Sequence, residues 1–204
     1  MIVSSSALLG RRTAEADIDR WDMRGAAHPG DDKKAVAAYA GFTMATQIAV
    51  VGGSEATAPV ITAAEAVGAT LASAGAIVIC GGLGGVMAAA CRGAKSAGGL
   101  TVGILPGTDP SAANPWVDVV IATGLGEARN ALVVGSAAVV IALDGEYGTL
   151  SEIVLALRAG TPVIGIGTWS LTRPDGEVDT GIVPMEDPCE AATVALSLAS
   201  ARSE

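Results

Sequence analysis

The stretch QIAVVGGSEATAPVITAAEAVGATLASAGAIVICGGLGG, residues 47–85, decides the fold of this chain. It contains two apolar runs, at residues 47–53 and 76–80, and both of them end in glycines. Between them lies a helical pattern from Pro59 to Ser73. A strand, a helix and a second strand of this length predict a β-α-β unit with parallel strands.

The same alternation continues along the rest of the chain. Helical patterns are expected at residues 86–97, 127–136 and Leu150–Arg158, the last of them stopped by Gly160, and Asp187-Pro188 opens a C-terminal helix. Further strands are expected in LTVGIL (100–105), VDVVIA (117–122), AAVVIAL (137–143) and PVIGIG (162–167). We therefore predict an α/β fold: a Rossmann-like, doubly wound, mainly parallel sheet of about six strands flanked by helices.

Composition indicates one domain preceded by an extension. Half of the 204 residues are apolar, and with one Phe, two Tyr and three Trp the core must consist mostly of aliphatic side chains and glycine. Residues 1–43 lack sustained periodicity and are predicted to be a mobile N-terminal extension, whereas 44–204 are predicted to form a single nucleotide-binding domain. The extension is either a docking arm or a sign that translation begins at Met44.

Charge and residue inventory exclude several classes of function. Residues 44–204 carry six basic against fifteen acidic side chains, which argues against nucleic acid and anionic membranes as partners. The three cysteines lack paired spacing and the only histidine, His28, lies in the extension, so we expect reduced thiols and no metal site. No apolar run reaches membrane-spanning length and no secretory signal precedes the domain, so we expect a cytoplasmic protein.

Three predicted strands end in glycine clusters. Ligands of doubly wound sheets bind beyond the carboxyl ends of the strands, where glycines let backbone N–H groups approach a phosphate. The spacing of GGLGG differs from GxGxxG, and no glycine loop ends in Lys-Ser or Lys-Thr, which argues against dinucleotide and P-loop sites. The clusters are Gly52-Gly53-Ser54, Gly81-Gly82-Leu83-Gly84-Gly85 and Gly145-Glu146-Tyr147-Gly148-Thr149.

Three motifs resemble the LONELY GUY family of nucleotide phosphoribohydrolases, also called lysine decarboxylase-like, in the branch near the molybdenum-cofactor carrier proteins. They are GGLGGVM at 81–87, GEARN at 126–130 and DGEYGTLSE at 144–152. The resemblance covers about residues 48–169. It implies a Rossmann-like fold, a homodimer or higher homo-oligomer, and a small phosphorylated ligand, with no additional cofactor required.

The resemblance also assigns roles to residues. It implies that Gly148, Thr149 and neighbouring amides hold a phosphate, while Arg129 and Glu152 act as catalytic residues beside an N-glycosidic bond. A carboxylate at this place can stabilise oxocarbenium character on a ribose and orient water. The ligand-binding residues predicted from the motifs and glycine clusters are Gly52, Gly53, Ser54, Gly81, Gly82, Gly84, Gly85, Met87, Asn130, Gly145, Tyr147, Gly148 and Thr149.

The residues leave two alternatives open. Glu152 in the first turn of a helix beginning at Leu150 would simply complement the helix dipole, and Arg129 could be neutralised by Glu127 or Glu152. In addition, Asp144 and Glu146 replace the proline and glycine of the family pattern, and Asn130 replaces a lysine. These departures favour binding without hydrolysis.

The first hypothesis is a protein that binds a nucleoside 5′-monophosphate or similar phosphorylated ligand at the glycine-rich loops, with hydrolysis to free base and ribose 5-phosphate as the activity that the resemblance implies. The alternative is a non-catalytic carrier or sensor of molybdenum cofactor or a nucleotide.

Overall fold

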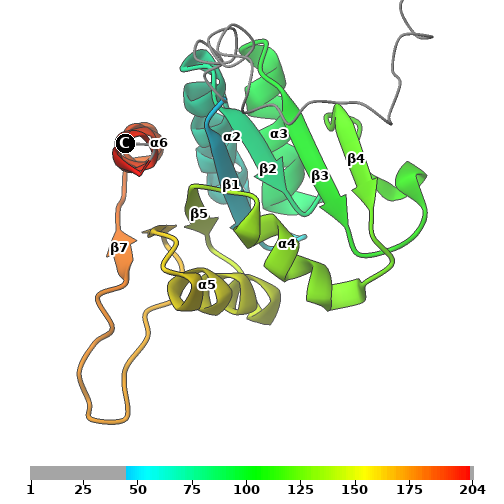
Figure 1. Ribbon diagram of the computed structural model, residues 1–204. Coiled ribbons are helices and arrows are strands. Elements are labelled where there is room, and N and C mark those ends of the chain that lie inside the picture. Colours follow the sequence, from blue (N-terminus) through cyan, green and yellow to red (C-terminus); the bar gives the residue numbers. More distant parts are fainter. Residues whose placement is uncertain (1–44, 203–204) are drawn as a thin grey trace, which may run out of the picture. The chain divides into compact units, whose positions relative to one another are not determined.

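The computed structural model describes residues 45–202, so the predicted extension, residues 1–43, lies wholly outside the described residues. Among residues 45–202, seven strands form one sheet (Figure 1). They are β1 (Gln47–Gly52), β2 (Ile77–Cys80), β3 (Thr101–Leu105), β4 (Val119–Ala122), β5 (Val139–Leu143), β6 (Val163–Ile166) and β7 (Ile182–Pro184). The helices are α2 (Ala58–Ser73), α3 (Gly85–Ser96), α4 (Asn130–Gly135), α5 (Tyr147–Ala159) and α6 (Pro188–Ala201), with short 3-10 turns η2 (Pro110–Ala112) and η3 (Gly126–Arg129).

The strand order is β4-β3-β2-β1-β5-β6-β7, and every neighbouring pair is parallel. The predicted α/β, Rossmann-like class is therefore confirmed. The chain first winds outward from β1 to β4 and then returns to the other side of β1 with β5. The switch in winding direction thus lies between β1 and β5, where doubly wound sheets bind their ligands.

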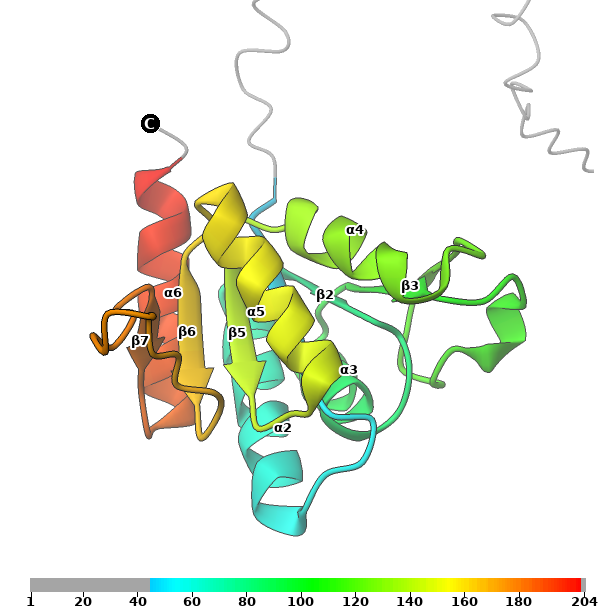
Figure 2. The ribbon, with the colours of Figure 1, turned by 90° about the horizontal axis from the view of Figure 1, so that it is seen from below.

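Helices cover both faces of the sheet (Figures 1 and 2). On one face, α2, α3 and α6 pack against strand residues such as Ile48, Val50 and Ile141. On the other face, α4 and α5 pack against the alternate residues, such as Val51 and Val140. Both faces of the central strands are buried, which explains why β1 and β5 are almost continuously apolar.

The ends of two helices follow the signals read from the sequence. Helix α5 ends at Gly160, which has a left-handed backbone with φ of 70°, as expected for a glycine that stops a helix. Helix α6 begins after Asp187, whose carboxylate accepts a hydrogen bond of 2.8 Å from the Glu190 N–H, and Pro188 occupies its first position.

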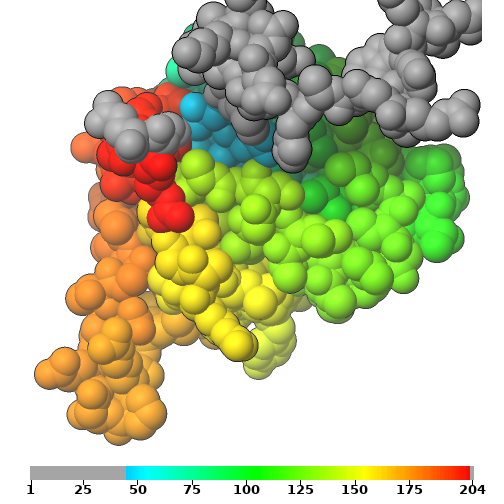
Figure 3. All heavy atoms as spheres, in the orientation of Figure 1, coloured from blue at the N-terminus to red at the C-terminus, as the bar shows by residue number. Residues whose placement is uncertain are grey.

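The structure differs from the prediction in the seventh strand and in the starts of two helices. Strand β7 has only three residues, lies at the sheet edge and leaves Val183 exposed, so it lacks the apolar run of the other strands. Helix α5 begins at Tyr147, three residues before the expected Leu150, and α4 begins at Asn130, after the 3-10 turn η3, instead of at residue 127. Residues 167–181, between β6 and β7, project from the body of the domain (Figure 3). No helix within residues 45–202 combines the length and the apolar character needed to cross a membrane.

Candidate functional site

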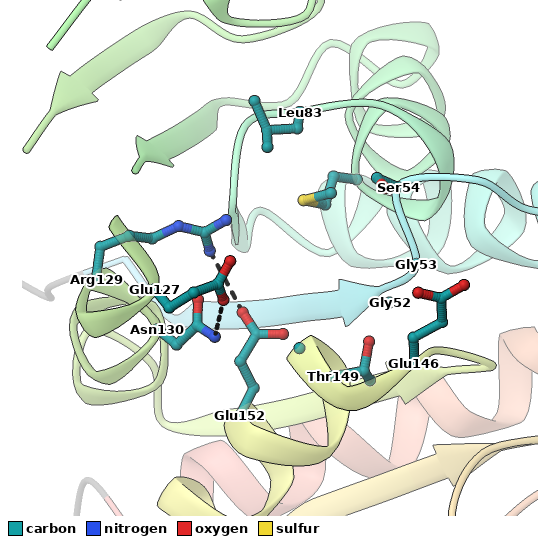
Figure 4. Close-up of a pocket in the computed structure, with 12 residues that line it drawn as sticks. Gly52, Gly53, Ser54, Leu83, Glu127, Arg129, Asn130, Glu146, Thr149 and Glu152 are labelled. Atoms are coloured by element: carbon teal, nitrogen blue, oxygen red, sulfur yellow. Dashed lines mark hydrogen bonds and ion pairs between the residues drawn. The ribbon is translucent and has the colours of Figure 1, made fainter. Parts of the chain in front are cut away.

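A pocket lies at the carboxyl ends of β1, β2 and β5, at the switch in winding direction. Its volume is about 230 Å³. Its walls come from the loop after β1, the start of α3, the η3–α4 segment and the start of α5 (Figure 4). The lining residues are Gly52, Gly53, Ser54, Leu83, Met87, Glu127, Arg129, Asn130, Glu146, Gly148, Thr149 and Glu152.

Most of the residues predicted from the sequence meet in this pocket. These are Gly52, Gly53, Ser54, Met87, Arg129, Asn130, Gly148, Thr149 and Glu152. Three further lining residues, Leu83, Glu127 and Glu146, were not among the predicted site residues, although each stands inside one of the three motifs. Position within these motifs was therefore the signal that would have identified them.

Other predicted residues lie outside the lining. Gly84 and Gly85 precede and begin α3, and Gly82 packs against β3. Tyr147 is 81% exposed, and its ring lies 5.9 Å from that of Trp169. Tyr147 is the first residue of α5 and does not line the pocket, whereas Gly148 and Thr149, which follow it, do. Gly145 packs against the Thr149 side chain instead of lining the pocket.

Gly81 lies directly behind the pocket although it does not line it. A Cβ at this position would stand 2.6 Å from both terminal nitrogens of Arg129 and 2.8 Å from the Met87 sulfur. Such distances are shorter than van der Waals contact, so any other residue here would displace the ends of the Arg129 and Met87 side chains. The glycine after β2 therefore helps to position Arg129.

Arg129, at the end of η3, is the only cationic side chain that residues 45–202 contribute to the pocket lining, and it is 7% exposed. Its Nη1 lies 3.5 Å from Oε1 of Glu152, which is 6% exposed on α5. Its Nε is buried without a hydrogen-bond partner in the part of the chain that the structure describes. An unpaired buried donor is costly, so we expect this N–H to find an acceptor beyond residues 45–202, such as a ligand or water.

The pKa of Glu152 is raised from its ordinary value of 4.5 to about 7. Burial is the main cause because it disfavours the charged carboxylate; the nearby Arg129 guanidinium opposes the rise, and the Glu127 carboxylate adds to it. Around neutral pH, Glu152 can therefore either accept or donate a proton. The alternative that Glu152 only complements the dipole of the helix N-terminus is wrong. Helix α5 begins at Tyr147, so Glu152 lies beyond its first turn, which contains no acidic residue.

A chain of hydrogen bonds holds the Arg129 segment against α5. The Asn130 amide donates to Ser151 Oγ at 2.8 Å and to Glu127 Oε2 at 3.4 Å. Ser151 Oγ in turn donates to the Gly148 carbonyl at 2.7 Å. Asn130, which stands where the family pattern has lysine, thus connects two walls of the pocket instead of adding a charge.

The pocket has two chemically different ends (Figure 4). At one end, Arg129, Glu127, Asn130 and Glu152 bring ionisable and amide side chains together. At the other, the loop 52–54 faces the first turn of α5, where the N–H groups of residues such as Gly148 lack partners within the helix. A helix N-terminus favours negative charge, so this second end is suited to an anionic group.

The loop between β5 and α5 has an unusual backbone. Asp144 has φ of 48°, a left-handed conformation that is rare for residues other than glycine. Its carbonyl accepts a 2.6 Å hydrogen bond from Thr168 Oγ1, and the Glu146 carbonyl accepts one of 3.3 Å from Trp169 Nε1. Proline, which the family pattern has at position 144, cannot adopt this φ. The departure from the pattern therefore changes the path of the loop as well as its charge.

Comparison with solved structures places the chain near molybdenum-cofactor proteins. The molybdenum cofactor binding protein from Rippkaea orientalis is 34% identical with a TM-score of 0.68, covering 76% of this chain and 98% of that one. The molybdenum cofactor carrier protein from Chlamydomonas reinhardtii is 32% identical with a TM-score of 0.66, covering 77% and 99%. DNA processing protein A from Helicobacter pylori, at 20% identity and a TM-score of 0.55, shares the fold alone.

Sequence comparison identifies the family. An uncharacterized protein of Archaeoglobus fulgidus is 40% identical over 151 residues, which are 74% of this chain and 95% of the relative. The model of the SLOG cluster4 family matches residues 45–192. This agrees with the resemblance to LONELY GUY proteins near the molybdenum-cofactor carriers that the motifs indicated. The chain belongs to the SLOG cluster4 family.

Proposed function

We propose that this protein binds a phosphorylated ligand, a nucleotide or a phosphorylated pterin such as molybdenum cofactor, and acts as its carrier. The observation that carries the proposal is the Arg129 guanidinium, whose Nε–H has no partner among residues 45–202, in the wall of a pocket whose other end is the N-terminus of α5. A ligand with a phosphate at one end and ring acceptors at the other would place the phosphate at the N-terminus of α5 and offer acceptors to the Arg129 guanidinium.

The comparisons support a carrier over an enzyme. The molybdenum-cofactor proteins from Rippkaea orientalis and Chlamydomonas reinhardtii are matched over almost their whole length. In this proposal the cofactor is cargo, and Arg129 with the amides of residues 52–54 and 148–149 would hold it.

The charges of the pocket place a condition on this ligand. Glu127, Glu146 and Glu152 oppose a single Arg129, so a bare phosphate would meet more negative than positive side chains. Protonation of Glu152, favoured by its raised pKa, removes one of these charges near neutral pH. The ligand must also offer hydrogen-bond donors to the remaining carboxylates, as amino-substituted rings and ribose hydroxyls do.

The test is calorimetric titration of the purified protein with AMP and, separately, with a phosphorylated pterin. The AMP mixture is then analysed for adenine and ribose 5-phosphate. Stoichiometric binding of the pterin with intact AMP is the expected result. Absence of heat with both ligands would contradict the proposed binding, and adenine release would replace the carrier by an enzyme.

The second candidate is hydrolysis of a nucleoside 5′-monophosphate to free base and ribose 5-phosphate. It is favoured by Glu152, which has a pKa of about 7 and lies 3.5 Å from Arg129. Such a group can orient water and stabilise positive charge on the ribose. If AMP is cleaved, Glu152→Ala is expected to abolish adenine release while leaving AMP affinity within a few-fold in the same titration. Equal loss of adenine release and AMP affinity would mean that Glu152 has a structural role in the pocket.

Removing the charge of Glu146 is expected to strengthen phosphate binding. Glu146 lines the pocket beside the first turn of α5, and its side chain makes no capping hydrogen bond. Glu146→Gly, or Glu146→Gln if only the charge is to change, should improve AMP affinity about three-fold at low salt, with the gain shrinking as salt rises. Glu177→Gln, on the exposed loop 167–181, is the matched control. Unchanged affinity for both Glu146 variants would place that carboxylate out of reach of the ligand.

The homodimer and the cytoplasmic location stay predictions. Size-exclusion chromatography with light scattering measures the first directly.

A further inference from the structure

Two buried thiols lie side by side next to the pocket. Cys80 is the last residue of β2 and Cys91 lies in the middle of α3. Their sulfur atoms are 3.4 Å apart and share a hydrogen bond, and both side chains are fully buried. Neither thiol lines the pocket, and the proposed function uses neither of them.

Both thiols contact elements of the pocket wall. Met87, which lines the pocket, packs against Cys80 and Cys91 in one small cluster. The Cys80 sulfur accepts a hydrogen bond of 3.3 Å from the Gly82 N–H, and the neighbouring Gly81 supports the Arg129 guanidinium. The thiol pair is therefore in direct contact with the loop 81–85 and with Met87.

We propose that Cys80 and Cys91 are a disulfide-forming pair, so that oxidation cross-links the end of β2 to α3 beneath the pocket. A disulfide needs its sulfurs roughly 2.0 Å apart, so the two atoms, now at 3.4 Å, must approach by only about 1.4 Å. The two thiols belong to consecutive elements of one β-α unit, so this approach shifts α3 slightly against β2 and leaves the sheet order unchanged.

The surroundings make Cys80 the nucleophile of the pair. The hydrogen bond from Cys91 lowers the pKa of Cys80, with further help from the Gly82 N–H and the Arg129 guanidinium, although burial acts in the opposite direction. The same shared hydrogen bond, together with burial, raises the pKa of Cys91. Because thiolates are the reactive form, oxidation begins at Cys80.

A peroxide supplies the oxidising equivalents. The Cys80 thiolate attacks one peroxide oxygen, the O–O bond breaks and hydroxide leaves, giving a sulfenic acid on Cys80. The Cys91 sulfur then attacks the sulfenic sulfur, forming the S–S bond and releasing water, while the thiol proton from Cys80 converts the hydroxide to a second water. Two thiols are oxidised to one disulfide, and one peroxide is reduced to two waters.

The methionines of the chain allow an unambiguous test. Cleavage after methionine with cyanogen bromide separates residues 45–87, which contain Cys80, from 88–185, which contain Cys91, and from 186–204, which contain Cys189. The folded protein is oxidised with diamide, which takes two electrons from a thiol pair and spares the thioether of Met87 needed for cleavage. Remaining thiols are blocked with N-ethylmaleimide under denaturing conditions before cleavage, and the masses of the fragments are measured by mass spectrometry.

The expected result is a linked species of fragments 45–87 and 88–185 that separates on reduction. The exposed Cys189 is replaced in a parallel Cys189→Ser variant, in which the same linkage is expected, and Cys91→Ala should lose it. Full N-ethylmaleimide labelling of Cys80 and Cys91 after oxidation, or linkage only through Cys189, would overturn the proposal. Both measurements can be made on the wild-type chain, so they hold even if a variant fails to fold.

Hydrogen exchange of the protein without ligand tests whether the disulfide changes the pocket wall. Hydrogen exchange of residues 81–90 is expected to slow several-fold in the oxidised protein, because the cross-link holds both ends of this segment. Residues 188–201 of α6, which do not contact the pair, should exchange at the same rate in both forms. Equal exchange of 81–90 before and after oxidation would contradict the coupling.

Discussion

Glu152→Gln is expected to stabilise the protein at about pH 8 by about 3 kcal/mol relative to wild type, and to have little effect below pH 4.5. The reason is the raised pKa of Glu152, about 7 in the folded chain against 4.5 for an ordinary glutamate. A carboxyl with a raised pKa holds its proton more tightly in the folded than in the unfolded state.

The direction of the pH dependence follows from this difference. Between pH 4.5 and about 7 the folded state binds more protons than the unfolded state, so the free energy of unfolding falls as the pH rises through this window. Above it the loss is complete. Glutamine resembles the protonated carboxyl in shape and charge but does not titrate, so the variant avoids the loss.

Urea unfolding of both proteins at a series of pH values measures the effect. The difference in unfolding free energy should grow steadily across the window and level off above it. Glu177→Gln, an exposed glutamate on the loop 167–181, is the control and should follow the wild type. If wild type and Glu152→Gln show the same pH dependence, burial does not raise the pKa of Glu152, and this carboxyl is ionised in the folded protein across the same pH range as in the unfolded one.

Arg129→Gln is expected to weaken ligand binding on the order of 100-fold, since hydrogen bonds from a charged donor in a buried site are strong. Arg129 supplies the only positive side chain of the pocket lining and a donor at Nε that has no partner in the described part of the fold. Glutamine fills part of the same space but removes the charge and the forked donor geometry.

The measurement is titration of wild type and variant with the ligand that binds in the first experiment. Arg158→Gln, on the exposed last turn of α5, changes the net charge equally and should bind as the wild type does. Loss of affinity in both variants would indicate a long-range charge effect. An affinity for Arg129→Gln within two-fold of wild type would show that the ligand does not use this guanidinium.

Much of the fold could be predicted because its signals are local. Each central strand, such as β1 or β5, is an apolar run with glycine at its end or within two residues after it. Two helices also have local signals of their own, Gly160 at the end of α5 and Asp187-Pro188 at the start of α6. The seventh strand could not be predicted this way, because three residues at a sheet edge with two exposed side chains have no periodicity of their own. Its pairing with β6 is a property of the tertiary structure.

The site was predictable in its members but not in its geometry. The motif spacing selected Arg129 and Glu152, yet their burial against each other depends on η3 and α5 meeting in space. Tyr147 lay inside a motif and still points outward, because the exact start of α5 decides which face each residue takes. The Nε of Arg129 has no hydrogen-bond partner among residues 45–202, and this could likewise not be predicted without the positions of the neighbouring atoms.

The position of the pocket across β1 and β5 also has a kinetic consequence. Strands β1 to β4 pair with their neighbours in chain order, whereas Ile48 on β1 pairs with Val139 on β5, and three strands and three α-helices lie between these two residues along the chain. Pairings between such distant segments close a long loop and therefore form slowly. The pocket can exist only after this step. The rate at which ligand binding recovers during refolding will therefore measure the rate at which β1 and β5 pair.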